Sequence, residues 1–224
     1  MAQAGIHGLV SLVVKKWTPA KEWLVLGIVI GSLLPDADNL VVAVATVAKM
    51  PTEGIHRTFT HSLFTILFVV IVCYLVSFIT KQIRWRYLGW GLGVGILLHI
   101  LLDLIIWFNG VAILWPIPSW INFWQNTSVP VWFDKLMQPA EFLCFALFLY
   151  ALGSAARKAR TDTDYLPTLR IWTIIQAVLL VIFTVLVYTM SKGFMTIYGV
   201  AYLLSLGLVA GITIRMRKTV ETAG

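Results

Sequence analysis

Charged residues and cysteines are scarce in this chain of 224 residues. Only 12% of the residues are charged, against about 25% in typical soluble domains, and 59% are hydrophobic. This composition excludes an ordinary soluble globular domain. The two cysteines, Cys73 and Cys144, both lie in apolar stretches, where a small apolar role is favoured over a disulfide. The sequence therefore indicates an integral membrane protein.

Long apolar runs predict an all-α fold, a polytopic transmembrane helical bundle. A helix needs about 20 apolar residues to cross the hydrocarbon core of a bilayer. About five full spans are predicted, over residues 63–80, 87–108, 140–156, 171–190 and 194–214. Shorter N-terminal helices, partial or tilted, are expected over residues 6–14, 23–34 and 41–48. We divide the chain into a metal-site helical membrane domain, residues 1–156, and residues 157–224, a cytoplasmic loop followed by two C-terminal transmembrane helices.

The net charge of +7 is a topology signal, although by itself it could suggest a nucleic-acid partner. Most of the 17 basic residues form four clusters in alternate connecting segments. The clusters are Lys15, Lys16, Lys21; Lys81, Arg84, Arg86; Arg157, Lys158, Arg160, Arg170; and Arg215, Arg217, Lys218. Such alternation follows from the positive-inside rule, which places these segments and the C-terminus in the cytoplasm. We expect the plasma (inner) membrane of a bacterium or archaeon and no nucleic-acid partner.

An H-x-x-x-D pair lies inside one of the predicted spans, in the run GILLHILLDLIIWF. His99 and Asp103 are spaced i,i+4, so both project from one helix face with Cβ atoms about 6 Å apart. Ionisable groups at membrane depth are costly unless they pair, meet water or bind a metal. Both residues could hold one metal, or Asp103 could orient His99. The structural alternative is a buried His–Asp hydrogen bond that ties two helices together.

Two further histidines, His56 and His61, flank an arginine in HRTFTHS. Both rings could face one pocket, with His61 the stronger candidate ligand. Alternatively this segment only caps the following helix, through Thr60 or Ser62. Arg57 could clamp a phosphate through its planar fork, or it could serve as an interfacial anchor.

Acidic residues and the remaining histidine complete the candidate set. Asp36 and Asp38 in LLPDAD could be ligands, or could cap a helix over residues 39–48. Glu141 could act in the site, or could be a first-turn acid favoured by the helix dipole. The topology derived from lysine and arginine alone places these residues, His7 and the histidine motifs at the extracytoplasmic ends of their helices. That convergence predicts one site on the outer side.

Together these residues resemble the YdjM-like family of inner-membrane metal-dependent hydrolases. The resemblance covers about residues 1–150 and is carried by His7, PDAD, HRTFTHS, HILLD, the following LWP and Glu141 in AEFLCFALFLYA. Asn39 stands where the family commonly has histidine, and Thr58 where glycine is usual. The order His, Asp, His, His-x-x-x-Asp, Glu is also distantly similar to the zinc-dependent phospholipase C and single-strand nuclease superfamily, which implies phosphoester chemistry.

We therefore expect a metal-dependent hydrolase that acts at the extracytoplasmic side on a phosphoester of a lipid or amphiphilic substrate. The expected cofactor is a divalent metal, with Zn²⁺ favoured by histidine and carboxylate ligands. The expected ligands are His7, Asp38, His61, His99 and Asp103, with His56 as a secondary candidate. Asp36 or Glu141 would be a further ligand or the general base, and Arg57 the contact to a substrate phosphate. Membrane lipids are the expected partners. The rival interpretation is a transporter or scaffold with a buried ion-binding site, although the chain has no convincing internal repeat.

Overall fold

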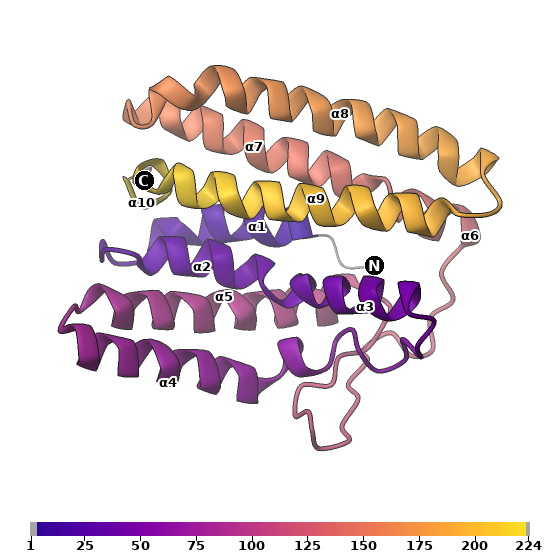
Figure 1. The fold of residues 1–224 in the computed structure, drawn as a ribbon, viewed down its shortest axis with the longest axis horizontal. Helices are drawn as coiled ribbons and strands as arrows, with labels where there is room; N and C mark the ends of the chain where they lie inside the picture. Colours follow the sequence, from indigo (N-terminus) through magenta and orange to yellow (C-terminus); the bar gives the residue numbers. More distant parts are fainter. Residues whose placement is uncertain (1–3, 223–224) are drawn as a thin grey trace. The chain divides into compact units, whose positions relative to one another are not determined.

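The computed structural model describes residues 4–222, which form helices joined by turns and one longer connecting segment (Figure 1). The α-helices are α1 (Ala4–Val14), α2 (Leu24–Leu33), α3 (Asn39–Val47), α4 (Leu63–Thr80), α5 (Arg84–Ile106), α6 (Val131–Met137), α7 (Ala140–Ala159), α8 (Leu166–Thr189), α9 (Phe194–Arg215) and α10 (Arg217–Thr222). Short 3₁₀ helices are η1 (Lys15–Trp17), η2 (Pro35–Asp38), η3 (Phe59–His61) and η4 (Thr163–Tyr165). Within residues 4–222 no β-strand occurs, only an isolated bridge between Val111 and Ile121. The predicted all-α class is confirmed.

Six apolar helical stretches of the described chain are long enough to cross a membrane. They are Leu24–Val47, Leu63–Thr80, Arg84–Ile106, Val131–Ala159, Thr163–Thr189 and Phe194–Arg215. Five correspond to the predicted spans. The sixth joins two stretches that we expected to be separate short helices, 23–34 and 41–48. Pro35 has no amide hydrogen for a continuous α-helix, so the chain tightens into η2 and then resumes as α3.

The chain forms two compact units. The first contains residues 4–10 and 128–222, and the second contains residues 11–127. The boundaries of these two units reflect how compactly the residues pack. The functional division at residue 156 expected from the sequence stays a prediction.

In the second unit, glycines on two faces of α5 allow close contact with two other helices. A Cβ atom at Gly95 would lie 2.7 Å from the backbone nitrogen of Ser32 on α2. A Cβ atom at Gly89 would lie 2.6 Å from Cβ of Cys73 on α4. The glycines facing α2 are Gly91 and Gly95, and those facing α4 are Gly89 and Gly93. Small residues of this kind let helix backbones approach closely inside a membrane.

The glycine contact also orients the H-x-x-x-D pair. Gly91, Gly95, His99 and Asp103 recur every fourth residue, so they form one stripe along α5. The glycine part of this stripe packs against α2. The polar part therefore faces the end of α2, where the chain turns into η2 and its two aspartates.

In the first unit, aromatic rings join α7, α8 and α9. The Phe142 ring of α7 lies 5.0 Å, centroid to centroid, from the Phe183 ring of α8, and Tyr198 of α9 lies 5.8 Å from each of them. All three side chains are buried. The last two predicted spans therefore pack through ring contacts, whereas the close helix contacts of the second unit rest on glycine.

Candidate metal centre

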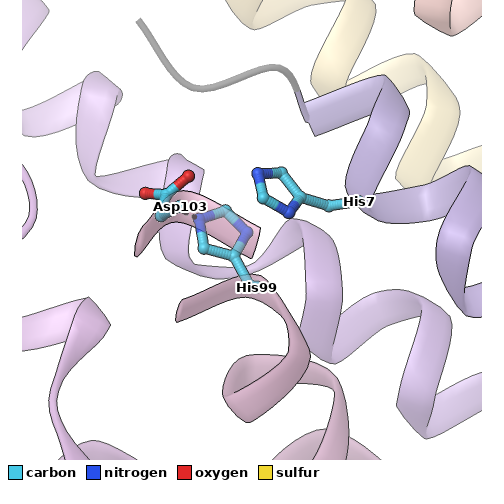
Figure 2. A group of neighbouring side chains, drawn as sticks. All are labelled: His7, His99 and Asp103. Atoms are coloured by element: carbon cyan, nitrogen blue, oxygen red, sulfur yellow. Dashed lines mark ion pairs between the residues drawn. The ribbon is translucent and has the colours of Figure 1, made fainter. Parts of the chain in front are cut away.

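Four of the predicted site residues meet inside the second unit. His61 comes from η3, His99 and Asp103 from α5, and Asp36 from η2. The two histidine Nε2 atoms are 3.1 Å apart, and Asp103 Oδ2 lies 3.6 Å from that of His61 and 3.7 Å from that of His99. Asp36 Oδ1 lies 3.8 Å from His99 Nε2. All four side chains are fully buried. Figure 2 shows His99 and Asp103 on neighbouring turns of α5.

The ring of His99 is fixed in one tautomer by the backbone of α2. Its Nδ1 atom lies 2.8 Å from the carbonyl oxygen of Ser32. A carbonyl oxygen can only accept, so Nδ1 carries the hydrogen and donates it. The neutral ring therefore presents a lone pair at Nε2, the atom that faces His61 and the carboxylates.

A hydroxyl relay fixes His61 in the same way. Thr60 Oγ1 donates to Asp38 Oδ2 at 2.8 Å and lies 2.9 Å from His61 Nδ1. Because the single hydroxyl hydrogen is used on Asp38, the threonine oxygen accepts from Nδ1–H of His61. Burial lowers the pKa of His61 well below its usual value, and the neighbouring His99 lowers it further. His61 is therefore neutral, and its Nε2 atom also presents a lone pair.

Two lone pairs facing each other at 3.1 Å repel unless a cation lies between them. Four ligands placed tetrahedrally about 2.0–2.1 Å from a zinc ion are about 3.4 Å from one another. His61, His99 and Asp103 lie 3.1 to 3.7 Å from one another, and Asp36 lies 3.8 Å from His99. The arrangement therefore fits the donor set of a single divalent ion.

The charges of the cluster favour the same conclusion. Three buried carboxylates, those of Asp36, Asp38 and Asp103, gather around neutral histidines. Arg57 is the cation in contact with them, with its Nε atom 3.5 Å from Asp103 Oδ2. With all three carboxylates ionised and the histidines neutral, two negative charges would be left over, and a divalent cation would neutralise them.

Asp36 is a buried carboxylate whose oxygens lack hydrogen-bond donors in the described chain. Within residues 4–222, neither of its side-chain oxygens has a hydrogen-bond donor. The capping alternative does not explain it, because α3 begins without a side-chain cap hydrogen bond. Burying a carboxylate whose oxygens accept no hydrogen bond costs several kcal/mol, so the surroundings of Asp36 fit a cation.

The carboxylate of Asp38 contacts three neighbouring residues and orients them. Its carboxylate lies 2.7 Å from His56 Nδ1, accepts from the Arg57 backbone N–H at 3.2 Å and accepts from the Thr60 hydroxyl. Asp38, His56 and His61 also form a second group with ligand atoms within 4.8 Å of one another. Asp38 can therefore orient His61 toward one ion or help to hold a second, and its predicted ligand role stays a prediction.

Arg57 lies beside the cluster with part of its guanidinium unused. It adopts a left-handed backbone conformation at φ 64° and is buried. Nη1 donates to the carbonyl oxygen of Asn109 at 2.9 Å, and Ala112 N–H donates to the Arg57 carbonyl at 3.0 Å. Nη2 has no hydrogen-bond partner within the described residues. The connecting segment thus holds this cation in place while one nitrogen stays available.

A cavity of about 540 Å³ adjoins the cluster. Its polar side is formed by Asp38 and Thr60, the residues that orient His61. The remaining lining is mostly apolar and comes from the end of α2, from η2, α3 and α4, and from the segment before η3: Leu34, Ala37, Val41, Ile55, Thr58, Phe59, Thr65, Phe68 and Val69. The volume falls in the range of small-molecule sites, about 300–1,000 Å³.

His7 and Glu141 belong to the first unit. Glu141 Oε1 accepts from the backbone N–H of Gly5 at 3.0 Å, so it caps the beginning of α1 from α7. His7 projects from α1 (Figure 2). Their predicted roles in the metal site stay predictions.

Two contributors were not identified as site residues from the sequence. Thr60 was considered only as a helix cap, but Ser62 is the cap of α4 and accepts from the Thr65 N–H at 3.2 Å. The carbonyl of Ser32 gives no sequence signal, because every residue has one. Asn39, at the position where the resembling family commonly has histidine, donates from Nδ2 to the backbone carbonyl of Asp36 at 2.9 Å.

Comparison with known proteins identifies a family. The model of the YdjM inner membrane protein family matches residues 4–195. The matched region contains all the candidate ligands, as the resemblance noted in the sequence implied. No curated protein matches, and no solved structure does.

Proposed function

The chain belongs to the YdjM inner membrane protein family, and we propose that it is a metal-dependent hydrolase within it. The family and the six apolar helices make it an integral inner-membrane protein. The observation that carries the proposal is the pair of imidazole Nε2 atoms facing each other at 3.1 Å beside two buried carboxylates.

His61, His99, Asp36 and Asp103 would hold the ion. A divalent metal such as Zn²⁺ in this position would supply a water of lowered pKa and a Lewis acid for the scissile group. The Ser32 carbonyl and the Thr60–Asp38 relay keep the two rings oriented with their lone pairs inward. The second oxygen of Asp36 is available to accept a proton from the attacking water.

A phosphoester is the substrate class that the cationic group favours. Arg57 places its Nε atom 3.5 Å from Asp103 Oδ2, and its Nη2 atom has no hydrogen-bond partner within the described residues. A guanidinium edge of this kind binds phosphate oxygens with fixed geometry. We propose that it binds the phosphate of the substrate.

The apolar cavity supports an amphiphilic substrate. Its walls include residues of two candidate membrane spans, Leu24–Val47 and Leu63–Thr80. An acyl or prenyl chain in this cavity would bring its polar end to Asp38 and Thr60. From the alternating basic clusters, we propose that the site faces the extracytoplasmic side and that the C-terminus is cytoplasmic.

Metal analysis of the purified protein tests the proposal. Wild type should retain at least one equivalent of divalent metal, and His99→Ala and Asp103→Ala should lose it. Exposed Asp134→Asn is the matched control and should retain it. Stoichiometric metal in both site variants would contradict the assignment. If metal is lost but wild type turns over no fluorescent phospholipid or lipid phosphate, the rival ion-binding scaffold is favoured.

A further inference from the structure

A second cavity, of about 900 Å³, lies along the hairpin of α7 and α8 in the first unit. The two helices pack side by side and are joined by the turn that contains η4. The buried lining includes Leu149 and Gly153 of α7 and Leu169 of α8. A Cβ atom at Gly153 would lie 3.0 Å from the Leu169 side chain, so the absence of a side chain there leaves this part of the cavity open.

Two arginines line the end of the cavity nearest the turn. Arg157 is two residues before the end of α7, and Arg170 is four residues after the start of α8. At 1.5 Å rise per residue, both lie within about 6 Å of the helix ends along the axis. Both are exposed, and the hydroxyl-bearing Thr163 of the turn lines the same cavity. Two cations and a hydroxyl donor therefore gather where the helices leave their apolar stretches.

The carboxylates of this turn are used elsewhere. Asp164 pairs with Arg215 at 2.9 Å, and Asp162 accepts from the backbone N–H and the hydroxyl of Thr219. Over residues 4–222, neither Arg157 nor Arg170 forms an ion pair with a carboxylate. Their charges are therefore available to an anion from outside the chain.

The other walls of the cavity are apolar and open to the surroundings. Tyr150, Ile171 and Ile174 are more than half exposed, and they lie in the candidate spans Val131–Ala159 and Thr163–Thr189. In a bilayer these side chains face hydrocarbon. The cavity thus combines a cationic end at the edge of the apolar region with an apolar groove running away from it.

We propose that this cavity binds one phospholipid with an anionic headgroup. The phosphate and headgroup contact Arg157 and Arg170, and an acyl chain lies over Gly153 between α7 and α8. Basic sites between transmembrane helices bind anionic lipid headgroups through the same charge complementarity. This site is independent of the histidine cluster, since every residue that forms it belongs to the first unit.

The test measures binding of fluorescent phosphatidylglycerol and phosphatidylcholine to the full chain in mild detergent. Wild type should prefer phosphatidylglycerol. The double variant Arg157→Gln, Arg170→Gln should weaken phosphatidylglycerol binding by roughly 30-fold, at about 1 kcal/mol for each arginine. It should weaken phosphatidylcholine binding much less, because the choline group offsets the phosphate charge. The matched control, Lys158→Gln with Arg160→Gln, removes the same charge from exposed neighbours that do not line the cavity. It should bind like wild type.

Three outcomes would overturn the proposal. One is equal preference for the two lipids in wild type, and another is the same loss in the arginine and control variants. The third is that glycerol 3-phosphate protects the protein against thermal unfolding as well as the lipid does, which would indicate a free-phosphate site.

A second variant, Gly153→Leu, fills the groove and should weaken binding of both lipids. Its melting temperature in lipid-free detergent identifies any packing defect. Unchanged binding by a stable Gly153→Leu would contradict the placement of the acyl chain.

Discussion

Replacing Asp36 by asparagine should raise the stability of the metal-free protein and abolish most of its stabilisation by metal. The substitution keeps the shape of the side chain and removes a charge that has no hydrogen-bond donor in the described chain. An unsatisfied buried group costs about 1–3 kcal/mol, and more when charged. In the metal-free protein, Asp36→Asn should therefore raise the melting temperature by several degrees.

With metal present the effect should reverse. At a concentration 100 times the dissociation constant, a ligand stabilises the folded state by about 2.7 kcal/mol, or roughly 5–10 °C for a chain of this size. If losing one carboxylate ligand weakens binding 100-fold, the same concentration stabilises by only about 0.4 kcal/mol, or roughly 1–2 °C. Each variant should therefore be compared with and without chelator.

The assay is intrinsic tryptophan fluorescence during heating, in detergent, with EDTA or with a zinc buffer. Exposed Asp134→Asn is the control and should behave like wild type in both conditions. The reasoning is refuted if Asp36→Asn lowers the melting temperature in EDTA and keeps the full shift on adding zinc. That result would mean that Asp36 has a structural partner and no ion.

Three further predictions follow from the same contacts. Thr60→Val should weaken metal binding 10–100-fold because the relay from His61 to Asp38 is lost, whereas Thr60→Ser should retain the affinity of wild type. Metal affinity is measured by competition with a fluorescent chelator, and equal affinities of Thr60→Val and wild type would show that the relay is not needed. Gly95→Val should destabilise the protein by about 1–3 kcal/mol or more and lower its metal content, because the new side chain would push α5 away from Ser32 of α2. Unaltered thermal unfolding and metal content would contradict the close contact of α5 with α2. Without metal, stability should fall as the pH drops below about 6.5, because His61 takes up a proton there in the unfolded chain but only at lower pH in the folded one. His61→Gln should reduce that slope in urea unfolding, and an identical slope would exclude His61 as its source.

Much of the fold could be predicted because it depends on a signal that is local in the sequence. Runs of about 20 apolar residues specify spans whatever their neighbours are. The join of α2 and α3 could not be read this way, because the polar residues of PDAD interrupt the run. The aspartates of PDAD contact histidines from distant segments of the chain, and no local sequence pattern encodes these contacts.

The residues of the site were easier to predict than their roles. The i,i+4 spacing of His99 and Asp103 fixes their common direction, since helix geometry alone sets it. Asp36 and Asp38 are only two residues apart in a 3₁₀ turn, so they point to different partners. We expected Asp38 as a ligand and Asp36 as a further ligand or the general base, and both roles stay predictions. The stripe of Gly91 and Gly95 continuing into His99 was visible in the sequence, and it is the signal that could have paired α5 with α2.

X-ray absorption at the zinc edge of the zinc-loaded, purified protein tests the central claim most directly. The account predicts one equivalent of bound zinc with two imidazole nitrogens at about 2.0–2.1 Å and carboxylate oxygens completing the shell. The imidazole scattering should disappear from the spectrum of His99→Ala together with the zinc. A shell of oxygen atoms without imidazole, or the same spectrum in wild type and His99→Ala, would contradict a shared ion at His61 and His99.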